Sequence, residues 1–128
     1  METSKIIEQL NAYEAKLFVR TAVGVEPAAP AVLSSNLLLI RGLLVQLVDR
    51  VAAAEKSYRH TKAARFDKFV SDGLKKSPAM DSLKMERDLI DLEIEVERLR
   101  GYMKYTDGLC TSVQSVLRVQ AGADKSQY

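Results

Sequence analysis

The sequence predicts an all-α protein: a long antiparallel helical hairpin of coiled-coil type, with a shorter N-terminal helix, that associates with copies of itself. Three observations predict this fold. The 128 residues are enough for one domain. Apolar residues recur at alternating intervals of three and four. The six glycines and three prolines fall mostly at a few breaks. We therefore expect residues 1–128 to form a single helical domain.

The N-terminal part predicts a helix over residues 4–20, with Ser4 as its cap. Its repeating residues are Ile6, Leu10, Tyr13 and Leu17. Helix-breaking residues follow, namely Gly24, Pro27 and Pro30. Residues 21–33 are therefore expected to be a linker or turn.

A second helix is expected over residues 36–72, because serine and asparagine caps precede it and no breaker occurs before Gly73. A seam of period 3.5 runs along it. The seam consists of Ile40, Leu44, Leu47, Val51, Ala54 and Tyr58. Gly73 suits the left-handed residue that ends a helix.

A short loop, 73–77, and a third helix, 78–119, complete the hairpin, since Ser77-Pro78 is a helix-start signal. The third helix has its own seam at four-three spacing. Its members are Met85, Leu89, Leu92, Val96, Leu99, Met103, Thr106, Cys110, Val113 and Leu117. Residues 120–128 are expected to fray. A short loop forces the two long helices to lie antiparallel, with facing residue numbers that sum to about 150.

The second helix carries more apolar surface than one neighbour can cover. Its segment 36–48, NLLLIRGLLVQLV, has apolar residues over an arc of about 220°. Surplus apolar surface usually marks subunit contacts, so we expect a homo-oligomer, although a three-helix bundle within one chain is the alternative. The expected interface residues are Leu37, Leu38, Leu43, Val45, Val48, Tyr102, Tyr105, Leu109 and Val116.

The charges predict a hairpin whose tip is basic and whose middle is acidic. Residues 56–87 hold nine Lys or Arg and four Asp or Glu, a net charge of +5, whereas residues 88–97 hold five acids and no base. Aromatic residues interleave with the cations in KSYRHTKAARFDKF. Binding of single-stranded nucleic acid needs this mixture, because cations contact the phosphates and flat rings stack on the bases. A solvated helix face would explain the same charges. The candidate nucleic-acid-binding residues are Lys56, Tyr58, Arg59, His60, Lys62, Arg65, Phe66, Lys68, Phe69, Lys75 and Lys76.

The sequence offers no catalytic, metal or cofactor motif, and we expect no enzyme activity. His60 has no second histidine or metal-spaced carboxylate near it. The single cysteine, Cys110, falls on a helix seam and is expected to be buried. One cysteine also suits a reducing compartment. Because Arg41 and Gln46 interrupt the apolar run, we expect a soluble cytoplasmic protein with no membrane contact.

Residues 51–118 resemble the UvsY-like recombination mediator proteins of tailed phages. The resemblance rests on KAARFDKFVSDG, residues 62–73, on the acid-rich helix that follows, and on GYMKYTDGLCTSVQSVLR. Lys62, Ala63, Arg65, Asp67 and Phe69 match the family's motif before the loop. The first 50 residues do not match.

The resemblance implies a helical, ring-forming protein in which Lys62 and Arg65 contact single-stranded DNA. It also implies two protein partners: a RecA-like recombinase, which the protein helps to load, and the single-strand DNA-binding protein that the recombinase displaces. The location would be the host-cell cytoplasm if a phage encodes the chain. The alternative is a structural or assembly protein that forms helical oligomers and binds no nucleic acid.

Overall fold

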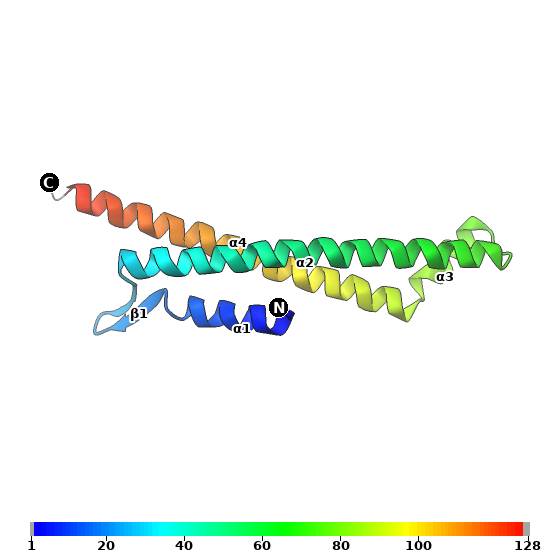
Figure 1. The fold of residues 1–128 in the computed structure, drawn as a ribbon, viewed down its shortest axis with the longest axis horizontal. Helices are drawn as coiled ribbons and strands as arrows, with labels where there is room; N and C mark the ends of the chain where they lie inside the picture. The colour runs from blue at the N-terminus through cyan, green and yellow to red at the C-terminus, as the bar shows by residue number, and fades with distance from the viewer. Residues whose placement is uncertain (1, 127–128) are drawn as a thin grey trace. The chain divides into compact units, whose positions relative to one another are not determined.

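The computed structural model describes the backbone of residues 2–126 and the side chains of residues 2–122. Its elements follow in the order α1 (Thr3–Glu14), β1 (Phe18–Thr21), β2 (Gly24–Pro27), α2 (Pro30–Ser71), α3 (Lys76–Lys84) and α4 (Arg87–Ser126) (Figure 1). The residues divide into two compact units. Unit 1 comprises Met1–Leu47 and Tyr102–Tyr128, and unit 2 comprises Val48–Gly101.

Unit 1 contains α1, the β-hairpin and parts of α2 and α4 around one apolar core. Residues from the seams predicted for the second and third helices meet in this core, as Ile40 and Cys110 do. Its buried members are Ile6, Leu10, Leu17, Ala28, Leu33, Leu37, Ile40, Leu43, Leu47, Cys110 and Val113. The buried polar side chains bond their own helices: Asn36 donates to the carbonyl of Val32, and Thr106 donates to that of Tyr102.

Unit 2 contains the rest of α2 and α4, joined by the turn after Ser71 and by α3. Its apolar core includes Val51, Ala79, Leu83, Leu89, Val96 and Leu99. Two ion pairs fix the antiparallel direction, because Glu55 pairs with Arg100 whereas Arg65, later in α2, pairs with the earlier Asp88. In both units a segment of α2 therefore packs against a segment of α4, and the predicted helical hairpin is confirmed.

The N-terminal boundaries differ from the prediction. The first helix ends at Glu14 rather than residue 20, and the expected linker is wrong because β1 and β2 form an antiparallel hairpin with Val19 opposite Glu26. Aromatic and β-branched residues favour strands over helices there. The chain then enters α2 at Pro30, so this proline begins a helix and does not break one as predicted. Proline suits this first position because its fixed φ matches the helix and a first-turn N–H needs no partner.

The expected end of the second helix is close to the observed one. Gly73 has a φ of +100°, its N–H donates to the carbonyl of Val70, and the N–H of Leu74 donates to that of Phe69. This pair of bonds is the Schellman motif, which needs a left-handed residue. The left-handed conformation predicted for Gly73 is thus confirmed.

The third helix was expected to be continuous over 78–119, and this is wrong. It is interrupted at Met85 and Glu86, between α3 and α4, and helical structure extends at the other end through Ser126. Most of the residues expected to fray therefore lie in α4, and residues 127–128 lie outside the described residues. No glycine or proline marks the interruption in the sequence. Met85, the first predicted seam residue, is 82% exposed, whereas Leu89 is buried.

Candidate nucleic-acid interface

All eleven candidate nucleic-acid-binding residues lie in unit 2, on α2, on the following turn or at the start of α3. The exposed members are Lys56, Arg59, His60, Lys68, Lys75 and Lys76. The half-buried members are Tyr58, Lys62, Arg65, Phe66 and Phe69. We call residues 56–87 the basic tip. Its cations do not form a single stripe, since Lys56 and Lys68 lie about 120° apart around α2 at 100° per residue.

Arg65 is engaged within the chain. Its guanidinium lies 3.5 Å from a carboxylate oxygen of Glu86 and 3.0 Å from one of Asp88. These acids flank the first residue of α4, where a carboxylate also favours the positive end of the helix dipole. Arg65 thus holds the α3–α4 junction against α2. The resemblance had implied that Arg65 contacts DNA, and this geometry gives the side chain a structural role.

Arg59 also has a carboxylate partner, but it is more exposed. It lies 3.6 Å from Glu55, one helical turn away, and 75% of its side chain is accessible. Glu55 is shared with Arg100 on α4. Exposed pairs of this kind contribute little, about 0.2–1 kcal/mol. Arg59 can therefore exchange this partner for a phosphate at small cost.

Five lysines of the basic tip have their ammonium groups available. Within the part of the chain that the structure describes, none of them forms an ion pair. They are Lys56, Lys62, Lys68, Lys75 and Lys76. The ammonium of Lys62 lies 5.7 Å from the centre of the Tyr58 ring, a cation–π distance that places a charge beside an aromatic surface.

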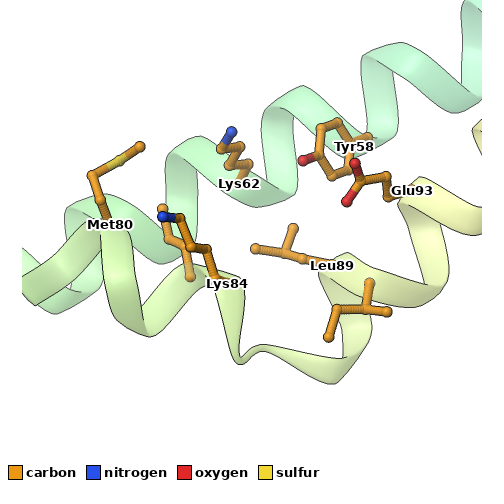
Figure 2. Close-up of a pocket in the computed structure, with 8 residues that line it drawn as sticks. Tyr58, Lys62, Met80, Lys84, Leu89 and Glu93 are labelled. Atoms are coloured by element: carbon orange, nitrogen blue, oxygen red, sulfur yellow. The ribbon is translucent and has the colours of Figure 1, made fainter.

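Of these lysines, Lys62 lines a groove, which Figure 2 shows between α2, α3 and α4. Its cavity is about 180 Å³, and we call it the tip groove. Lys84 and Met80 lie at one end, Tyr58 and Glu93 at the other, with Leu89 between them (Figure 2). A second cavity, of about 270 Å³, shares Lys62, Met80 and Leu83 with it and extends to Phe66.

Sequence reasoning missed most residues of this groove. It used Leu89 only as a seam residue, and Lys84 and Glu93 only in charge counts. Lining residues of α2 and α4 such as Tyr58 and Glu93 satisfy the hairpin rule, since their numbers sum to 151. The expected register therefore predicts that Tyr58 and Glu93 lie close together at one end of the groove. It cannot place the lining residues of α3, because their position depends on the break at Met85.

The expected interface residues divide by burial. Leu37 and Leu43 are 6% and 3% exposed and belong to the core of unit 1, so they are inaccessible to a second chain, which corrects the expectation. Tyr102, Leu109 and Val116 pack partly against that core. On the surface of the same unit, Leu38 and Val45 are 68% and 62% exposed and lie seven residues apart on α2.

Two further interface candidates are accessible. Val48, in unit 2, is 46% exposed, and Tyr105, in unit 1, is 50% exposed. The Tyr105 hydroxyl donates a hydrogen bond to the carboxylate of Glu14 on α1. This hydrogen bond raises the pKa of Tyr105, and burial and the charge of Glu14 act in the same direction.

Helix α2 is long and apolar enough, by length and composition alone, to cross a membrane. One third (33%) of its most apolar stretch is buried. Residues of this part of α2, such as Leu37 and Ile40, belong to the core of unit 1. Core helices of soluble proteins meet the same criteria. The expectation of a soluble protein therefore stays a prediction.

The reactive side chains are isolated. Among the described residues, no group of three or more His, Cys, Asp or Glu is placed to hold a metal ion. Cys110 is buried, as predicted, and burial raises the pKa of its thiol, so it is a poor nucleophile. His60 is exposed on α2.

Comparison of the chain with protein-family models, with curated proteins and with solved structures found no match. The charges and contacts described above therefore carry the functional argument.

Proposed function

We propose that the protein is a non-enzymatic accessory protein that binds single-stranded DNA and helps to load a RecA-like recombinase in place of single-strand DNA-binding protein. The main support is one observation: five lysines that form no ion pair among the described residues lie along the C-terminal part of α2, in the following turn and at the start of α3, beside half-buried aromatic rings. The likeness of residues 62–73 to UvsY-like mediators supports the same function.

Both components of single-strand binding are available at the basic tip. Lysines on different sides of the tip suit a flexible strand that curves around it, because phosphates attract cations without a demand for fixed geometry. Tyr58, Phe66 and Phe69 are half-buried, so part of each ring remains accessible. Stacking of one base on an aromatic ring contributes about 1–3 kcal/mol.

Self-association would strengthen a weak individual tip. If copies associate through the exposed residues Leu38 and Val45, several tips act on one strand, and the second contact becomes effectively intramolecular. Such an assembly can hold DNA firmly and still release it one tip at a time. This property suits a protein that passes a strand to a recombinase.

The test is a titration of a fluorescent single-stranded oligonucleotide at low and moderate salt. The wild type should bind tightly at low salt, and Lys75→Ala with Lys76→Ala should weaken binding and reduce the salt slope by about 1 for each lost phosphate contact. The matched control is Lys5→Ala with Lys104→Ala, which removes the same charge from exposed positions of unit 1. Absence of binding at low salt contradicts the proposal.

The alternative is a structural or assembly protein that forms helical oligomers without nucleic acid. The exposed apolar residues of α2, Leu38, Leu39 and Val45, favour it, since they fit self-association and have no need of DNA. An oligomer that shows no affinity for single-stranded DNA would support this alternative. A recombinase ATPase assay on DNA coated with single-strand binding protein tests the mediator step separately.

A further inference from the structure

We infer that the tip groove takes one unpaired nucleobase of the bound strand, and that Glu93 favours bases with an exocyclic amino group. This inference rests on the proposed function and adds a base preference to it. A phosphate-binding surface alone would treat all bases alike.

The groove has the surfaces that a flat ring requires. Two of its lining residues, Leu83 and Leu89, are buried, with 4% exposure each. Two others, Met80 and Ile90, are 44% and 41% exposed, so their apolar side chains are accessible to a ligand. Its volume of about 180 Å³ is below the range of about 300–1,000 Å³ typical of drug-sized ligands. A single ring system is therefore a suitable occupant.

The charges around the groove are arranged for an occupant with two different ends. Lys84 lies towards Met80 and Glu93 lies at the opposite end beside Tyr58, while Lys62 lies between them with its ammonium 5.7 Å from the centre of the Tyr58 ring (Figure 2). Phosphates would be attracted to the lysines and repelled by Glu93. The base must then present its edge to the carboxylate, which can only accept hydrogen bonds when ionised.

A carboxylate at this edge distinguishes between the pyrimidines. Cytosine carries an amino group that donates to a glutamate, whereas the corresponding group of thymine is a carbonyl oxygen, which Glu93 repels. The amino group is engaged in the base pair of a duplex, and a stacked base cannot enter a groove. The same contact therefore favours unpaired strands.

The neighbouring cavity continues the path of the strand. It shares Lys62, Met80 and Leu83 with the tip groove and ends at Phe66 and Arg59. A following base can lie against Phe66, with Lys62 between the two bases and near their common phosphate. This second position has no carboxylate, so the base preference belongs to Glu93.

The experiment compares fluorescent oligo-dC and oligo-dT of equal length at low salt and slightly alkaline pH, by fluorescence anisotropy. One hydrogen bond to the base predicts that wild-type protein binds oligo-dC about 3- to 10-fold more tightly. Glu93→Gln should remove this preference, since a glutamine amide donates to thymine as well as it accepts from cytosine. Glu97→Gln is the matched control, an exposed acid one turn further along α4; it should raise both affinities and leave their ratio unchanged.

The outcomes separate the two proposals. Equal wild-type affinity for both oligonucleotides, or a ratio that Glu93→Gln does not change, overturns the inference and leaves single-strand binding intact. No binding of either oligonucleotide at low salt overturns the proposed function itself. Met80→Trp gives a second test, because an indole in the groove should abolish the base preference and preserve the salt dependence that the lysines provide.

Discussion

Arg65 illustrates how one side chain can carry a motif and still have a structural role. In the sequence it is one of nine cations in the basic tip and part of the segment that resembles a DNA-binding motif. In the structure it bonds Glu86 and Asp88 and is 37% exposed at its side chain. The five lysines of the basic tip named above have no such partners among the described residues, so the cations of one surface differ in what they contact.

Replacement of Arg65 by alanine should destabilise the protein by about 1 kcal/mol, because two carboxylates at the α3–α4 junction lose their partner. Lys68→Ala, at an exposed site with no ion pair, should change stability by less than about 0.5 kcal/mol. Urea unfolding followed by circular dichroism measures both. Equal stability of the two variants would show that Arg65 is as free as the lysines.

Tyr105 predicts a dependence of stability on alkaline pH. Its hydrogen bond to Glu14 raises its pKa, so the folded chain holds the phenolic proton more tightly than the unfolded chain. The resulting stabilisation is present below about pH 10 and is lost as the pH rises through the folded pKa. Tyr105→Phe should remove about 0.5 kcal/mol at neutral pH and flatten this loss. Urea unfolding from pH 8 to 11 measures the free energy of unfolding of the wild type and of Tyr105→Phe. An identical pH dependence of the two proteins would contradict the prediction.

At the scale of elements, backbone conformation decides where the helices end. Gly73 ends α2 in a left-handed conformation, and Pro30 begins the same helix. The interruption between α3 and α4 has no such residue. Contacts explain it instead: Leu83 and Leu89 are both buried in unit 2, and Arg65 holds the acids at the junction. An uninterrupted helix would turn these side chains away from their partners.

Gly73→Ala should destabilise the protein by about 1 kcal/mol, since alanine is strained at a φ of +100°. Gly101→Ala is the matched control within a helix. A Cβ there meets no atom within 4 Å, and helix propensity predicts a gain of about 0.5–1 kcal/mol. Thermal unfolding should therefore shift in opposite directions for the two variants. A shift in the same direction would contradict the left-handed ending of α2.

At the scale of the whole molecule, unit 1 has a core built from elements at both ends of the chain, and unit 2 carries the basic tip. Unit 1 nevertheless leaves large apolar side chains on the surface of α2. This division suits a protein that associates through one part and binds through the other. Self-association remains a prediction, and it is testable without DNA.

Leu38→Glu with Val45→Glu should convert an oligomer into monomers, because the two residues lie seven apart on one exposed face of α2, and glutamates there would repel each other across an interface. Val23→Glu, at a position 85% exposed in the β-hairpin turn, is the control and should leave the assembly unchanged. Analytical ultracentrifugation at tens of micromolar measures both. A monomeric wild type would contradict the prediction.

The sequence by itself determined the two long helices, their antiparallel pairing and the charge of the basic tip. These features follow from periodicity, from Gly73 and from composition, all of which are local. It also determined the burial of Cys110, which lies on the seam. Local signals suffice here because a 3.5-residue repeat places its apolar residues on one side of a helix, and that side must be buried against another helix.

The tertiary structure alone decided the β-hairpin, the break at Met85 and Glu86, the partners of Arg65 and the tip groove. Leu17 and Ala28 enter the core on either side of the hairpin, and a hydrogen bond of 2.8 Å joins them. The break, the partners of Arg65 and the tip groove depend on residues distant in sequence, such as Arg65 and Asp88, that meet only after the chain has folded. The β-hairpin is local, but the residues that flank it are buried in a core that α2 and α4 complete. The free energies of these tertiary contacts outweigh the differences in helix propensity, which are less than about 1 kcal/mol between most residues.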